Sequence, residues 1–143
     1  MNILKNGKII LAFDKKGFIK SLKYGSKEYI SAAMPVFNIA FRDKSGTQTT
    51  VDAFETKCTA CGLSDDSITC SYKKDGLNVI ITVKLTEEIS WGITIEGAGE
   101  KAVEWVDYPQ LACPDDFADN GGTSKFLWGF NEGTLIENMN DRE

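Results

Sequence analysis

Pairs of adjacent acidic residues are the first candidates for chemistry in this sequence: Asp65 and Asp66, Glu87 and Glu88, and Asp115 and Asp116. Glycosidases use two carboxyl groups held roughly 5 to 9.5 Å apart across a sugar ring. Neighbouring side chains on a strand point to opposite faces, so adjacent acids are poorly placed for that geometry. We therefore expect no catalytic residue among these pairs.

The chain of 143 residues contains no histidine. This composition excludes Ser-His-Asp triads, Cys-His dyads and histidine-ligated zinc from the chain itself. The formal net charge of −5 also argues against a nucleic-acid partner, because domains that bind nucleic acids are normally basic. An enzyme made of this chain alone would have to use carboxylates, Lys, Tyr or Cys.

Four cysteines could form a metal or redox site: Cys58, Cys61, Cys70 and Cys113. Cys58 and Cys61 have the C-x-x-C spacing, but the other two do not supply a second pair for a zinc ribbon. A redox C-x-x-C needs a helix N-terminus at its first thiol, whereas this one lies in a strand-rich region. We expect reduced thiols that pack as small apolar side chains, with a disulfide between two of them as the open alternative.

Hard oxygen ligands gather between the last strands, at Asp115, Asp116, Asp119 and Asn120. Calcium binds such oxygens on flexible loops, although the spacing does not match an EF-hand. We expect no cofactor, and calcium at this loop is the alternative.

Three tryptophans are candidates for binding. Trp91 lies on an alternating apolar face and is predicted to be in the core. Strand alternation places Trp105 on the same face as Val103 and Asp107, either in the core or half exposed. Trp128 precedes a glycine that leaves its surroundings open, so its ring could stack on a sugar or pack against another domain.

A two-residue period of apolar side chains, interrupted by turn residues, runs along the chain and must position these groups. Turns are predicted at residues 14–17, 43–46, 73–76 and 97–100, and no segment has the period of a helix. The pattern predicts an all-β antiparallel two-sheet sandwich of about ten to twelve strands. The length suits one domain over residues 1–143.

Targeting signals are not evident in the sequence. The apolar run at residues 9–13 is too short for the core of a signal peptide. No apolar stretch reaches the roughly 20 residues needed to span a bilayer, so we expect no membrane partner. The cellular compartment stays open.

Several stretches resemble the N-terminal domain of a known group of enzymes. The first is Leu4-x-Asn6-Gly7-x-Ile9-x-Leu11-x-Phe13, followed by Gly17-x-Ile19-x-Ser21-Leu22; the others are residues 105–111 (WVDYPQL) and 127–136 (LWGFNEGTLI). Together they resemble the β-sandwich that precedes the (β/α)-barrel in bacterial alpha-galactosidase-like glycoside hydrolases. That domain is a supersandwich similar to galactose mutarotase.

This resemblance implies a non-catalytic domain, because the acid/base pair of such hydrolases lies on the barrel. It implies that the chain is the N-terminal fragment of a longer hydrolase and that the downstream barrel is its partner. The mutarotases of this fold use histidines, which this chain lacks. Residues placed at the rim of the barrel's active site are, by position, Trp128, Asn131 and Glu132, with Asp115 and Asp116 behind them.

The sequence therefore predicts an accessory domain of a glycoside hydrolase that packs against a catalytic barrel. One alternative is a free-standing carbohydrate-binding module that uses Trp128 and Trp105. Another is a structural or adhesion sandwich without a ligand.

Overall fold

The computed structural model describes residues 1–114, 125–128 and 134–137, the last two segments by their backbone. The chain divides into two compact units, Met1–Ala112 and Cys113–Glu143. In the second unit, β12 pairs antiparallel with β13, from Lys125 opposite Glu137 to Trp128 opposite Thr134. The expectation of one domain over the whole chain stays a prediction.

The predicted all-β fold is confirmed. The described residues contain no α-helix and form thirteen strands, slightly more than the sequence predicted. The strands are β1 (Asn2–Asn6), β2 (Ile9–Phe13), β3 (Ile19–Tyr24), β4 (Lys27–Glu28), β5 (Asn38–Arg42), β6 (Gln48–Asp52), β7 (Lys57–Leu63), β8 (Ser67–Lys74), β9 (Leu77–Leu85), β10 (Ile89–Glu96), β11 (Ala102–Asp107), β12 (Lys125–Trp128) and β13 (Thr134–Glu137). Over the described ranges, no helix is long and apolar enough to cross a membrane.

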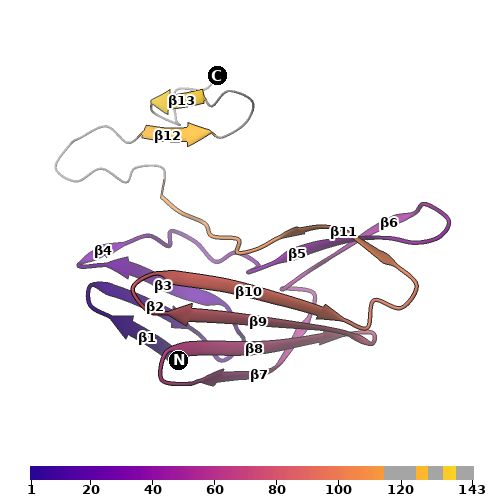
Figure 1. Cartoon of the computed structure of the whole chain (residues 1–143), viewed down its shortest axis with the longest axis horizontal. Helices are drawn as coiled ribbons and strands as arrows, with labels where there is room; N and C mark the ends of the chain where they lie inside the picture. Colours follow the sequence, from indigo (N-terminus) through magenta and orange to yellow (C-terminus); the bar gives the residue numbers. More distant parts are fainter. Residues whose placement is uncertain (115–124, 129–133, 138–143) are drawn as a thin grey trace. The chain divides into compact units, whose positions relative to one another are not determined.

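Residues 1–112 form three antiparallel sheets (Figure 1). Their strand orders are β1-β2-β3-β4, β10-β9-β8-β7 and β11-β5-β6. Most neighbouring strands are also neighbours in sequence, as in a meander, but β11 pairs with β5, which lies far from it in the chain. This long-range pairing places β11, the last strand of the first unit, beside a strand from much earlier in the chain.

The hairpin turns form where the sequence predicts them. In the β2–β3 turn, the Asp14 carboxylate accepts hydrogen bonds from the backbone amides of Lys16 (2.8 Å) and Phe18 (3.0 Å). At the β8–β9 tip, Asp75 and Gly76 have φ angles of 47° and 86°. Two consecutive residues with positive φ match the twist of the flanking strands, which is why Asp-Gly sequences favour such hairpins.

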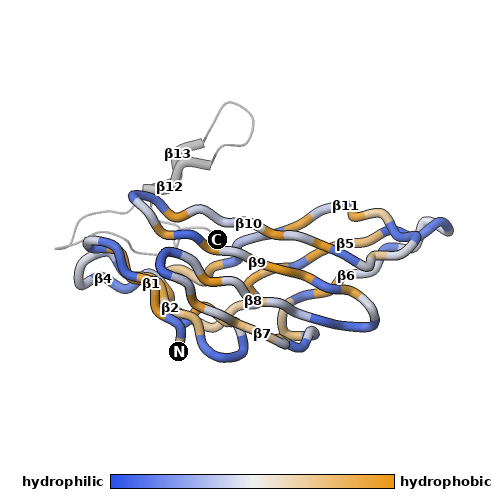
Figure 2. Tube along the Cα trace, turned by 60° about the horizontal axis from the view of Figure 1, so that its bottom comes forward, coloured by the Kyte–Doolittle hydropathy of each residue, from blue (hydrophilic) through white to orange (hydrophobic). Residues whose placement is uncertain are grey.

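One apolar core is shared by the three sheets, which is the arrangement of a β-sandwich. β9 shows the alternation most clearly, because Leu77, Val79, Ile81, Val83 and Leu85 are all buried. Figure 2 shows the apolar residues within the strands and the hydrophilic residues mainly in the connections.

Trp91 packs against this core, as predicted, although it is only partly buried. Its ring meets that of Tyr108 edge to face, with 6.0 Å between the ring centroids.

Candidate functional site

The outer surface of the sheet β11-β5-β6 carries a tryptophan among polar side chains. Residues directly opposite each other in antiparallel strands point to the same face. Ile39 and Phe41 of β5 point into the core, so the residues that alternate with them point outward. We call this outward surface the Trp105 face; it consists of Asn38, Ala40, Arg42, Gln48, Thr50, Asp52, Ala102, Glu104, Trp105 and Asp107.

A β-bulge decides the orientation of Trp105. Val103 lies opposite Phe41, but Trp105 lies opposite Ala40, so Glu104 is an extra residue in β11. Two residues of a bulged strand then oppose one on the partner, and the alternation shifts by one position. The prediction that Trp105 shares a face with Val103 is therefore wrong: Trp105 points outward with Asp107, and Val103 points toward the core side.

Glu104 uses its bulged position to reach across the sheet. Its carboxylate accepts hydrogen bonds from Nε and Nη2 of Arg42, at 3.0 and 2.5 Å, and from Nε2 of Gln48, at 2.7 Å. The hydrogen bonds from Arg42 and then from Gln48 hold the pKa of Glu104 below its ordinary value. Arg42 also donates to the Gly46 carbonyl oxygen at 2.6 Å, so all three side chains are held in place.

The exposed fraction of Trp105 is 37%. Its strand partner Ala40 is fully buried, so the accessible part of this surface consists of the indole ring and the polar side chains around it. A ring with one open side next to ordered guanidinium, carboxylate and amide groups can hold a sugar, because the ring contacts C–H groups while the polar groups exchange hydrogen bonds with hydroxyls.

The structure does not test the other predicted site residues. Asp115, Asp116, Asn131 and Glu132 lie outside the described residues. Trp128 ends β12, where its backbone pairs with Thr134. Their predicted role at an active-site rim stays a prediction.

The cysteine prediction is wrong for one pair. Cys61 and Cys70 lie opposite each other on β7 and β8 and form a disulfide, while Cys58 and Cys113 are free. Burial raises the pKa of the Cys58 thiol. Within the described segments, no group of three His, Cys, Asp or Glu side chains could hold a metal ion. The predicted calcium ligands Asp115, Asp116, Asp119 and Asn120 lie outside these segments.

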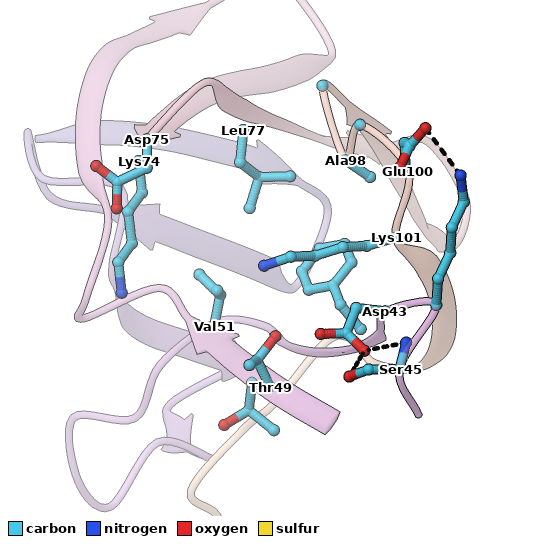
Figure 3. A pocket seen from close by; sticks show the side chains of 15 residues that line it. Asp43, Ser45, Thr49, Val51, Lys74, Asp75, Leu77, Ala98, Glu100 and Lys101 are labelled. Carbon is cyan, nitrogen blue, oxygen red and sulfur yellow. Dashed lines mark hydrogen bonds and ion pairs between the residues drawn. The ribbon is translucent and has the colours of Figure 1, made fainter. Parts of the chain in front are cut away.

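A cavity that the sequence analysis missed opens at one end of the sandwich (Figure 3). We call it the end cavity; its volume is about 760 Å³. It lies where three connections meet: the β5–β6 turn, the β8–β9 tip and the β10–β11 connection. Its size falls in the range of roughly 300–1,000 Å³ that is common for small-molecule sites.

Two contacts fix the connections around the end cavity. Lys44 Nζ lies 2.9 Å from Glu100 Oε1 and joins the β5–β6 turn to the β10–β11 connection. Gly97, with φ +74°, packs against the Gly76 carbonyl group so closely that a side chain there would clash with it. The β8–β9 tip and the β10–β11 connection are therefore in direct backbone contact.

Part of this arrangement could have been inferred from the predicted turns. In an antiparallel meander, alternate turns lie at the same end of the sheet, so the turns at 73–76 and 97–100 had to be neighbours. The turn at 43–46 belongs to a different sheet, and its position beside these two turns depends on how the sheets pack. No local sequence pattern indicates that packing.

Neither a protein-family model nor a curated protein matches this sequence.

Proposed function

We propose that this β-sandwich is a non-catalytic accessory domain of a glycoside hydrolase and that the Trp105 face binds carbohydrate. The observation that carries the proposal is the exposed indole of Trp105 beside the network of Arg42, Glu104 and Gln48. The three polar side chains come from three adjacent strands and lie on one sheet face.

The chemistry of this surface matches that of a sugar. A pyranose presents a face of C–H groups with hydroxyls around its edge. An aromatic ring has a large apolar surface that can pack against the C–H face of the sugar. Charged hydrogen-bonding groups suit the hydroxyls, since hydrogen bonds to ionised partners are shorter and stronger than neutral ones.

The link to a glycoside hydrolase is supported by the sequence resemblance and by the sandwich architecture. A supporting role fits the lack of histidine, because the mutarotases of the resembled fold depend on that residue. The sugar class proposed first is a galactoside, since alpha-galactosidase-like enzymes are the ones the sequence resembles.

Packing against a catalytic barrel through β11 is the second candidate role. It is favoured by the apolar exposure of β11, where Val103 and Val106 are exposed at 44% and 36%. Exposed apolar residues on an edge strand also suit contact with another domain.

Affinity electrophoresis separates the two roles. The wild-type chain, Trp105→Ala and Val103→Ala migrate through native gels with and without dissolved galactomannan. Val103 is the matched control, because it is exposed on the same strand but points to the opposite face. We expect the polysaccharide to slow the wild type and Val103→Ala, and Trp105→Ala to migrate as in a plain gel.

Unchanged migration of the wild type in gels of galactomannan and of other plant and bacterial polysaccharides would contradict the sugar role and favour packing against a barrel. Hydrolysis of a nitrophenyl galactoside by the purified chain would contradict the non-catalytic role.

A further inference from the structure

One of the three lysines that line the end cavity differs from the other two in its contacts. Lys44 pairs with Glu100 at 2.9 Å, and Lys74 pairs with Glu55 at 2.8 Å. The ammonium group of Lys101 forms no ion pair with any residue of the described ranges. Figure 3 shows the Lys101 side chain extending across the cavity between Leu77 and Asp43.

Asp43 is the acidic group beside Lys101, and its carboxylate is already engaged. Oδ1 accepts hydrogen bonds from the backbone amide and the hydroxyl of Ser45, at 2.9 and 2.6 Å, and from the backbone amide of Thr47, at 3.0 Å. These bonds close the β5–β6 turn. The charge of Lys101 also helps to lower the pKa of Asp43, but the two groups form no ion pair, so the Lys101 ammonium can still contact a ligand.

Beneath the charged rim, the cavity is lined with apolar side chains. Four of its lining residues are apolar and come from four different segments: Phe41, Val51, Leu77 and Ala98. They belong to the core cluster or pack against it, so they are firmly held.

We propose that the end cavity binds a small organic monocarboxylate, with the carboxylate on the Lys101 ammonium and an apolar body over Phe41, Val51 and Leu77. One free ammonium matches one carboxylate. Thr50 is shared with the Trp105 face, but the proposal does not rest on the proposed sugar binding.

The test is a two-dimensional NMR titration of the full chain. The probes are benzoate, which has both features of the proposed ligand, benzyl alcohol, which lacks the charge, and glucuronate, which lacks the apolar body. We expect benzoate to shift the amide signals of Val51, Ala98 and Lys101 and to bind at least fivefold more tightly than the other two probes.

Variants of Lys101 test the charge contact directly. Lys101→Met keeps the length of the side chain and removes the charge, and should weaken benzoate binding by roughly tenfold. Lys101→Arg should keep most of the affinity. The matched control is Lys84→Met, which removes a half-exposed lysine paired with Asp66 at the other end of β9 and should leave binding unchanged.

Three results would overturn the proposal. One is the absence of benzoate-induced shifts at the cavity. Another is equal affinity for benzoate and benzyl alcohol, or tighter binding of glucuronate. The third is unchanged benzoate affinity of a folded Lys101→Met variant, with folding checked from its own NMR spectrum.

Discussion

The hydroxyl group of Tyr72 donates a hydrogen bond to the carbonyl oxygen of Gly17 at 2.7 Å. Tyr72 lies on β8 and is fully buried, and its ring meets Phe37 edge to face at 5.1 Å. Burial raises the pKa of the phenol, so the hydroxyl keeps its proton and remains a donor. One side chain thus joins β8 to the β2–β3 turn and to the segment that leads into β5.

Replacing Tyr72 with Phe should lower the free energy of unfolding by about 1 to 3 kcal/mol, because the buried Gly17 carbonyl loses its partner while the ring packing remains. Urea denaturation followed by circular dichroism measures the change. The control is Tyr24→Phe, since Tyr24 is exposed at 56%. Equal midpoints for Tyr72→Phe and the wild type would contradict this role.

Gly17 is required both for its conformation and for its lack of a side chain. Its φ is +81°, and a Cβ atom there would overlap the Tyr72 ring. Gly25 also has positive φ, +63°, but open space around it. Gly25→Ala should cost only the conformational penalty of about 1 to 2 kcal/mol, whereas Gly17→Ala should cost about 1 to 3 kcal/mol more, from overpacking. Similar unfolding midpoints for the two variants would be evidence against the close contact.

Glu28 should make stability depend on pH. Burial alone would raise its pKa, but hydrogen bonds from the Ser21 hydroxyl and from the backbone amides of Leu22, Ile30 and Tyr29 outweigh burial and lower it. A carboxyl with a lowered folded pKa stabilises the fold above the unfolded pKa, here about 4.5, and this stabilisation is lost as pH falls through the folded pKa.

We therefore expect the free energy of unfolding of the wild type to fall below about pH 4.5 more steeply than that of Glu28→Gln. Denaturant melts from pH 7 to pH 3 provide the comparison. Glu87→Gln, in the exposed β9–β10 turn, should follow the wild type. Parallel pH profiles for wild type and Glu28→Gln would exclude this contribution.

Arg42 should matter for sugar binding more than for stability. Arg42→Met leaves the Glu104 carboxylate with Gln48 alone, and should weaken binding of galactomannan oligosaccharides by roughly five- to tenfold. The unfolding midpoint should change little, because exposed ion pairs contribute about 0 to 1 kcal/mol. Lys44→Met, which breaks another exposed pair from the next turn, should bind like the wild type. If Lys44→Met weakened binding as much as Arg42→Met, the loss of a positive charge, and not the loss of the Glu104 network, would explain the weaker binding.

Local sequence signals are enough to predict the hairpins of this fold. The alternation of Val79, Ile81 and Val83 and the Asp75–Gly76 tip specify the β8–β9 hairpin without knowledge of the rest of the chain. The pairing of β11 with β5 was beyond such reasoning, because these strands are far apart in sequence and nothing local selects the partner.

The candidate site was predicted less completely for the same reason. Trp105 was singled out by its residue type, but its face was assigned wrongly, because the bulge at Glu104 arises from pairing with β5. Arg42 and Gln48 were missed, since they reach Glu104 only across that pairing. Lys101 was missed because the sequence does not show which lysines of the cavity form ion pairs and which one does not.

Isothermal titration of galactomannan oligosaccharides into the chain tests the central proposal, sugar binding by the Trp105 face, most directly. The account predicts saturable heat for the wild type and for Val103→Ala, and no measurable heat for a folded Trp105→Ala variant. Binding by Trp105→Ala with the affinity of the wild type would contradict it.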